Sequence, residues 1–160
     1  RRRRARRRRG RSRRLTARYD QVGGDRLRAM VVDFYDRVFA DVMIGFLFAG
    51  KDRALLVQRE WELAARMLGG DVAYTGRPIH VAHRHVPILG GHFDRRLELW
   101  RQAMVDHGFP AEVQDTLMQH NRALRAQVTN DPTSDCNHAQ VAGPAPIGAP
   151  ERLIGLGKRG

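Results

Sequence analysis

The sequence predicts an all-α protein, with about five helices between residues 19 and 129. Apolar residues recur at every third or fourth position in several long windows, as they do along the buried face of a helix. No stretch alternates apolar and polar residues with a period of two over more than a few positions, so no strand is predicted. Glycine pairs and prolines separate the helical windows and mark where the chain turns.

The first helix is predicted over roughly residues 26–40. It follows a turn at residues 19–25, in which two glycines can take positive φ and Asp25 can cap the helix. Its apolar face contains residues at helical spacing: Leu27, Met30, Val31, Phe34, Val38 and Phe39. Tyr35 lies beside this face, where its ring can be buried while its hydroxyl finds a polar partner.

The second helix is predicted from Asp52, as its N-cap, to about Leu68, where Gly69 and Gly70 end it. Residues 41–52 before it are irregular and contain phenylalanines, which indicates that they cover something apolar. The predicted inward stripe has a spacing of four, three and four residues: Leu56, Glu60, Leu63 and Met67. Glu60 is the exception in this stripe, because an unpaired buried carboxylate is costly.

The second half of the chain predicts a short histidine-bearing helix after Pro78, then two longer helices. One covers about residues 92–107, with an apolar face made of Phe93, Leu97, Trp100 and Met104. The other covers residues 111–128, with an apolar face made of Val113, Leu117, Leu124 and Val128.

The positive charge is concentrated at one end of the chain. The formal net charge is +12, but residues 1–14 hold 11 of the 29 Lys and Arg residues and no acidic residue. Such a run cannot bury apolar surface, so residues 1–18 are predicted to form an Arg-rich disordered tail. Residues 130–160, rich in Gly, Pro, Ser and Asp, are predicted to form a second disordered tail, which leaves 19–129 as the folded domain. Without aromatic residues, the first tail could attract nucleic acid or an anionic membrane only non-specifically.

The sequence also predicts a soluble cytoplasmic protein. A single cysteine, Cys136, suits a reducing compartment. The longest apolar run, at residues 42–49, is too short to cross a bilayer, and no signal-peptide apolar core follows the Arg run.

Four of the seven histidines lie in one short window, and they allow two ligand hypotheses. His80 and His83 are three residues apart on a helix, so both could bind one metal ion together with His92 or Glu60. Alternatively, one histidine could bind haem iron, with phenylalanine and tyrosine side chains on facing helices as the other walls of the pocket. The alternative without a ligand is that these histidines are hydrogen-bonded structural residues.

Short motifs in order along residues 19–128 resemble those of truncated haemoglobins, which have the shortened two-on-two globin fold, and most closely those of group I. They are Tyr19-Asp-x-Val-Gly23-Gly24, Phe34-Tyr35, Phe48-Ala-Gly50-x-Asp52, Leu68-Gly69-Gly70, Tyr74-Thr75-Gly76, and His83 followed ten residues later by Phe93. Arg96 stands where other truncated groups keep a tryptophan, which also favours group I. The resemblance implies a two-on-two helical sandwich around haem (iron protoporphyrin IX).

The resemblance implies that His83 is the iron ligand. His85 is the rival, because His85-Val86-Pro87 mimics the His-x-Pro of other truncated groups, but it lies two residues too close to Phe93. On the distal side, the resemblance implies that Tyr35 donates a hydrogen bond to bound oxygen and that Leu56 and Glu60 line the pocket.

The remaining contacts with haem are also implied by the resemblance. Phe48 corresponds to the phenylalanine that stacks on haem, Tyr74 and Phe93 belong to motifs at the pocket, and Arg59 corresponds to a basic residue that reaches a propionate. Glu60 departs from the family, which usually has Gln or Leu there. Its carboxylate is therefore expected to be protonated, paired with Arg59 or Arg66, or turned outward.

The implied function is reversible binding of O2, and also of NO and CO, at ferrous iron, for oxygen binding or transport. An enzymatic alternative is an NO dioxygenase, which converts NO to nitrate. It would need an external reductase, because the sequence contains nothing that looks like a flavin or nicotinamide site. Two alternatives from other classes are a helical protein tethered to nucleic acid or membrane through the Arg-rich tail, and a helical protein with a histidine metal site.

Overall fold

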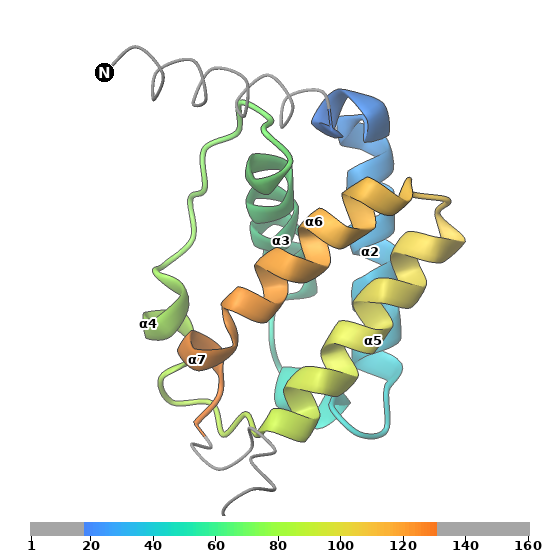
Figure 1. The fold of residues 1–160 in the computed structure, drawn as a ribbon. Coiled ribbons are helices and arrows are strands. Elements are labelled where there is room, and N and C mark those ends of the chain that lie inside the picture. The colour runs from blue at the N-terminus through green and yellow to red at the C-terminus, as the bar shows by residue number, and fades with distance from the viewer. Residues whose placement is uncertain (1–17, 131–160) are drawn as a thin grey trace, which may run out of the picture.

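The computed structural model describes residues 18–130, and these residues form helices and connecting loops with no strand among them (Figure 1). The elements are α2 (Gly24–Ala40), η1 (Gly45–Phe48), α3 (Arg53–Met67), α4 (Ile79–His83), α5 (Gly90–Asp106), α6 (Ala111–Ala123) and α7 (Arg125–Val128). The all-α prediction is confirmed. Apart from residues 18 and 130, the two predicted tails lie outside the described residues, and so does Cys136.

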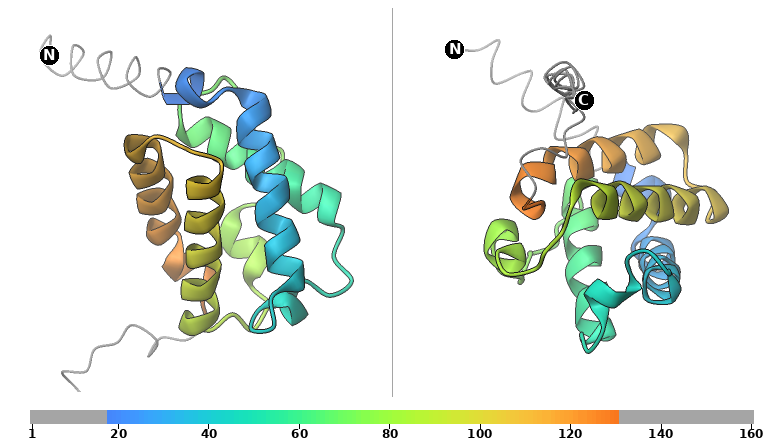
Figure 2. Two further views of the ribbon diagram at one scale, coloured as in Figure 1. Left: turned by 90° about the vertical axis from the view of Figure 1, so that its right-hand side faces the viewer. Right: turned by 90° about the horizontal axis from the view of Figure 1, so that it is seen from below.

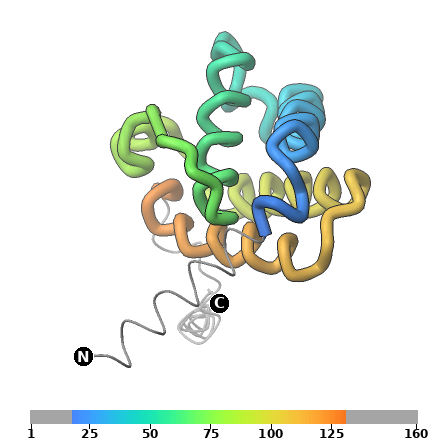
Figure 3. The backbone as a smooth tube through the Cα atoms, turned by 90° about the horizontal axis from the view of Figure 1, so that it is seen from above, coloured from blue at the N-terminus to red at the C-terminus, as the bar shows by residue number. Residues whose placement is uncertain are grey.

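Four helices form two packed layers. The pair α2 and α3 packs across the pair α5 and α6, and two views of the molecule show one pair lying over the other (Figure 2 and Figure 3). The short helices α4 and α7 pack against each other beside these layers. This is the predicted two-on-two arrangement. No helix in the described part of the chain is long and apolar enough to cross a membrane.

The core lies between the two layers, and its centre is a pair of aromatic rings. Phe34 on α2 meets Trp100 on α5 edge to face, with ring centroids 4.8 Å apart, and both side chains are fully buried. Around them lie buried apolar residues from three of the helices, α2, α5 and α6: Leu27, Met30, Val31, Val38, Leu97, Met104, Val113 and Leu117. Burial of each such side chain stabilises the fold by about 1.5–3 kcal/mol, so the predicted apolar faces hold the layers together.

The ends of α3 form as predicted. The Asp52 carboxylate accepts a hydrogen bond from the Leu55 amide at 3.0 Å and caps the first turn. At the other end Gly69 has a φ of 89°, a conformation that glycine adopts without strain, and the helix ends there.

Two predicted boundaries were wrong. Residues 18–22 are helical rather than part of a turn, and Gly23, with a φ of 79°, occupies the N-cap position that was predicted for Asp25. Asp25 lies instead in the first turn of α2, where its charge still favours the positive end of the helix dipole. The single helix predicted over 111–128 is interrupted at Leu124, because the amide of Leu124 bonds the Asn121 carbonyl, a tighter i to i+3 turn.

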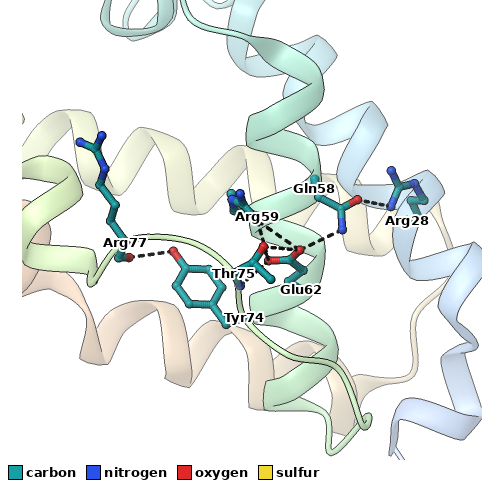
Figure 4. Close-up of polar contacts among 7 residues, drawn as sticks. All are labelled: Arg28, Gln58, Arg59, Glu62, Tyr74, Thr75 and Arg77. Atoms are coloured by element: carbon teal, nitrogen blue, oxygen red, sulfur yellow. Dashed lines mark hydrogen bonds and ion pairs between the residues drawn. The ribbon is translucent and has the colours of Figure 1, made fainter.

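A buried carboxylate, Glu62, joins α3 to the segment that leads into α4 (Figure 4). Glu62 is 4% exposed. Its oxygens accept hydrogen bonds from the Thr75 amide at 2.8 Å, from the Thr75 hydroxyl at 2.9 Å, and from Gln58 at 3.0 Å. The Arg59 guanidinium lies 3.3 Å away, and Arg28 on α2 donates to Gln58 at 2.8 Å. Glu62 therefore fixes where the chain leaves α3 on its way to α4.

Replacing Glu62 with Ala should lower the free energy of unfolding by about 3 kcal/mol, because the substitution leaves the Thr75 amide and Arg59 without their buried acceptor. Urea-induced unfolding followed by circular dichroism measures this change. The matched control is Glu98→Ala, since Glu98 pairs with Arg101 at a solvent-exposed site and should cost less than about 1 kcal/mol. Equal losses in the two variants would contradict the anchoring role of Glu62.

The contribution of Glu62 should also depend on pH. Burial alone would raise its pKa, but the hydrogen bonds from Thr75 and Gln58 and the charge of Arg59 hold the pKa below its ordinary value of 4.5. A carboxylate with a lowered pKa stabilises the fold above its unfolded pKa and loses that contribution as the pH falls. The difference in unfolding free energy between the unsubstituted chain and Glu62→Gln should therefore be full above pH 4.5 and shrink below it. A difference that stays constant through this range would disagree with this account.

Candidate functional site

A cavity of about 610 Å³ lies between the helical layers and α4. Its apolar lining comes from η1, α3, α4, α5, α7 and the loops between them: Leu47, Phe48, Leu55, Leu56, Leu63, Ile79, Ala82, Val86, Ile88, Phe93, Leu124 and Val128, with Ile44 at the start of η1. Its polar lining consists of Tyr35, Lys51, Arg59, Glu60, Tyr74, Thr75, Arg77, His83, His92, Arg96 and Asn121. All eight predicted site residues are therefore brought together around one cavity.

His83 is the last residue of α4, and its half-buried ring lines the cavity. Its Nδ1 lies 2.7 Å from the carbonyl oxygen of Ile79, one turn earlier in the helix. This bond assigns the proton to Nδ1, which donates to the carbonyl and leaves Nε2 with a lone pair. A histidine oriented in this way has the geometry of a metal or haem ligand with a fixed tautomer.

The other histidines of the window are placed differently. His80 and His85 are exposed, and neither lines the cavity. His92 does line it, but its Nδ1 accepts the amide proton of Leu89 at 3.2 Å at the start of α5. Within residues 18–130, no group of three or more His, Cys, Asp or Glu side chains could hold a metal ion. The metal-site hypothesis that combined His80 and His83 with His92 or Glu60 was wrong, because His80 points to solvent and the other side chains do not meet at one point although they line the same cavity.

A polar network forms another wall of the cavity, with one residue from each of the four long helices. The Arg96 guanidinium on α5 donates to Glu60 Oε2 on α3 at 2.7 Å and to Asn121 Oδ1 on α6 at 2.9 Å. The Tyr35 hydroxyl on α2 donates to the same Glu60 oxygen at a longer distance of 3.5 Å. Glu60 is therefore paired, but with Arg96, a partner that none of the expected alternatives named.

The alternative in which Glu60 pairs with Arg59 or Arg66 was wrong for a geometric reason. Arg59 is adjacent to Glu60 in the helix and points to a different side, where it reaches Glu62. Arg66 is exposed. Arg96 was noticed in the sequence only as a replacement for tryptophan, and Asn121 was missed. A polar residue inside the otherwise apolar inward face of α6 was the available signal for Asn121.

The surroundings of this network fix its charges. Burial is the largest influence on Tyr35 and, with the nearby negative charge of Glu60, it raises the pKa of the phenol far above its ordinary value. Burial would lower the pKa of Arg96, but Glu60 and Tyr35 outweigh this effect and raise it. Tyr35 is thus a neutral hydrogen-bond donor, and Arg96 is a permanent cation.

Three of the four residues in the stripe predicted to face inward from α3 line the cavity, and the fourth, Met67, packs against the core. Leu56, Glu60 and Leu63 line the cavity, whereas the buried core face of the helix and its C-cap contains Val57, Ala64, Ala65 and Leu68. Helical periodicity identifies a face that is shielded from water, and it cannot distinguish a packed core from a cavity that a ligand fills.

Four further predicted residues complete the lining. Phe48 in η1 has its ring 6.2 Å from that of Tyr35, and Phe93 on α5 is buried. The Tyr74 hydroxyl donates to the Arg77 carbonyl at 3.1 Å (Figure 4). Arg59 lines the cavity while it bonds Glu62.

Two basic residues in loops, Lys51 and Arg77, also line the cavity and are exposed to solvent. Sequence reasoning missed both of them, although Lys51 lies inside one quoted motif and Arg77 directly follows another. An apolar cavity with one oriented imidazole and cations at its open side suits haem, a flat apolar macrocycle that carries iron and two carboxylates.

Comparisons with known proteins agree with this geometry. The sequence pattern of the family described as bacterial-like globin matches residues 17–130. The group 1 truncated haemoglobin GlbN of Mycolicibacterium paratuberculosis is 34% identical over 95 residues, which cover 59% of this chain and 70% of that protein. The group 1 truncated haemoglobin GlbN of a Nostoc species is 26% identical over 113 residues, which cover 70% of this chain and 96% of that protein.

Solved structures show the same fold. A crystal structure of the truncated haemoglobin of Tetrahymena pyriformis, in its Fe(III) form, matches with a TM-score of 0.66 at 22% identity, over 71% of this chain and 98% of that chain. The 2/2 haemoglobin of a Synechococcus species, in the cyanomet state with covalently attached haem, also matches with a TM-score of 0.66, at 21% identity over the same shares of the two chains.

The match to the family extends over more than half of the sequence, and the two-on-two fold agrees with it. The chain therefore belongs to the bacterial-like globin family and is a truncated haemoglobin, most like group 1, of a kind that binds haem and gaseous ligands.

Proposed function

We propose that His83 holds the haem iron and that the chain binds O2, and also NO and CO, reversibly at the wall where Tyr35 lies. One observation carries this proposal: the same cavity is lined by the His83 imidazole, which the Ile79 carbonyl orients, and by the neutral phenol of Tyr35. Haem, when bound, supplies an iron with an open coordination position for a diatomic gas. The residues of the chain supply the orientation and the polarity around that position.

The walls of the cavity suit the remaining parts of the cofactor. Phe48, Leu56 and Phe93 offer apolar surface to the macrocycle, and Tyr74 lies at the same cavity. Arg59 is proposed to reach a propionate, as the family resemblance implies. Because Arg59 already bonds Glu62, the exposed cations Lys51 and Arg77 are proposed to share this role.

Tyr35 is proposed to donate its hydroxyl proton to the bound gas. The phenol remains neutral because its pKa is raised, so it can donate without bringing a charge into the cavity. Its present contact with Glu60 is 3.5 Å long, beyond the roughly 2.5–3.0 Å range of strong O–H···O bonds. This contact is weak enough to be exchanged for one with a ligand.

The physiological role that we propose is oxygen binding or transport in the cytoplasm. The single cysteine of the sequence suits a reducing compartment. Conversion of NO to nitrate would use the same cavity but would need electrons from an external reductase. We therefore place it second.

Replacing His83 with Ala should abolish stable haem binding or remove its five-coordinate spectrum, because the cavity loses its oriented imidazole. Visible absorption of the ferric, reduced and CO-bound forms is the measurement, and His85→Ala is the matched control because His85 is exposed and does not line the cavity. Added imidazole should restore the spectrum of His83→Gly. If His85→Ala loses the spectrum and His83→Ala keeps it, the assignment of the ligand is wrong.

Replacing Tyr35 with Phe should raise the rate of O2 dissociation about tenfold or more, because a hydrogen bond to a partly charged acceptor is worth about 1.5–3 kcal/mol. Stopped-flow mixing or flash photolysis measures this rate. Tyr19→Phe removes a tyrosine hydroxyl outside the cavity and serves as the control. An unchanged rate in Tyr35→Phe would exclude Tyr35 from contact with the gas.

A further inference from the structure

The wall of the cavity contains one complete ion pair. Arg96 Nη2 and Glu60 Oε2 lie 2.7 Å apart, and the two side chains are only 18% and 13% exposed. The chain compensates both charges. Asn121 Oδ1 accepts a hydrogen bond from the other terminal nitrogen of Arg96. The guanidinium also lies over the rings of Phe34 and Trp100, 5.0 and 5.8 Å from their centroids. The pair is therefore an integral part of the wall and has no net charge.

An ion pair with no net charge distinguishes between classes of ligand. A neutral gas leaves the net charge of the wall unchanged. An anion that enters from water adds a negative charge to a wall that already has one, which is costly away from water. A small weak acid HX enters without charge and can then transfer its proton to Glu60. The H–X bond breaks, X keeps the electron pair, and an O–H bond forms on the carboxylate.

The transfer keeps the number of charges constant. Before it, the carboxylate of Glu60 balances Arg96. After it, X⁻ balances Arg96, and the neutral carboxylic acid of Glu60 can donate a hydrogen bond to the anion. The proton transfer itself therefore adds no net charge to this wall. In this respect the pair differs from a single cation, which would bind anions of every kind.

We propose that Glu60 is the proton acceptor and Arg96 the counter-ion for small weak acids that enter the cavity undissociated and remain as their anions. The ligand class comprises acids that are undissociated near neutral pH, such as hydrogen cyanide or hydrogen peroxide. The inference rests on the proposed function, because the haem that His83 holds is what retains the anion.

Other groups near Glu60 are less well placed to accept the proton. The phenols of Tyr35 and Tyr74 already carry their protons, because burial raises the pKa of each. Arg59 is committed to Glu62. His120 is a further rival, since the Glu60 charge reaches it, but burial lowers its pKa and it does not line the cavity. His92 does line the cavity, but its Nδ1 already accepts the Leu89 amide proton.

The test uses hydrogen cyanide as the probe and the ferric, haem-loaded protein. Infrared difference spectra should show a new carbonyl stretch of a protonated carboxylic acid when cyanide binds, with a shift in D2O. The band should be absent in Glu60→Gln and present in the control Glu98→Gln, which changes a glutamate on α5 outside the cavity.

The number of protons released gives a second, independent readout. The unsubstituted protein keeps the proton of the acid, so its cyanide affinity should stay constant from about pH 6 to about pH 8. In Glu60→Gln the proton must leave for water, so the affinity should rise about tenfold per pH unit. Arg96→Met should lower the affinity about tenfold or more, because the anion loses its counter-ion.

Each outcome decides between the alternatives. Absence of the band, with a cyanide affinity in the unsubstituted protein that already rises about tenfold per pH unit, overturns the inference. A pH-independent affinity that persists in Glu60→Gln assigns the proton to another group, such as His120, and also overturns it. If Glu60→Gln does not fold, the double variant Glu60→Gln/Arg96→Met removes both charges and should lack the band.

CO binding by the reduced, unsubstituted protein separates the two proposals, because its failure would reject the proposed function itself.

Discussion

The contact between Phe34 and Trp100 is the interaction on which the arrangement of the cavity depends. These two fully buried rings pack α2 against α5 at the centre of the two-layer core. Successive residues of a helix differ in direction by about 100°, so once Phe34 points at α5, the next residue, Tyr35, must point to a neighbouring side. That side is the cavity. In the same way Arg96, one turn before Trp100 on α5, lies over the ring of Trp100 and reaches Glu60. Core packing thus sets the positions of the polar groups.

Helix α3 connects three environments because each of its sides has a different composition. Small residues, Ala64 and Ala65, allow close approach to the core. Leu56 and Glu60 face the cavity. Glu62 holds the segment that runs toward α4. Since α4 packs mainly on α7, and not on the layers, this anchor helps to position the segment that carries His83.

The sequence was sufficient for the parts of the fold that depend on local pattern. Periodicity identified the long helices, and Asp52 and Gly69 marked the two ends of α3 through short-range chemistry. The family resemblance supplied the cavity residues. Pairings across the fold were not predictable, since Glu60 and Arg96 are 36 residues apart and several arginines closer in sequence were equally plausible partners. Glu62 was missed because its partner, Thr75, lies in a loop without periodicity.

The distribution of charge around the cavity has a consequence for how a cofactor with two carboxylates would lie in it. Lys51 and Arg77 are exposed at the cavity, whereas the positive charge of Arg96 is balanced by Glu60. Carboxylates are therefore attracted to the open side and gain nothing at the buried pair. The apolar edge of such a cofactor, by contrast, would lie among the apolar lining residues Ile88, Phe93 and Leu124. Charge and burial thus favour the same orientation, with the acidic edge in solvent. The neutral ion pair is then left to face the space in which a small ligand would bind.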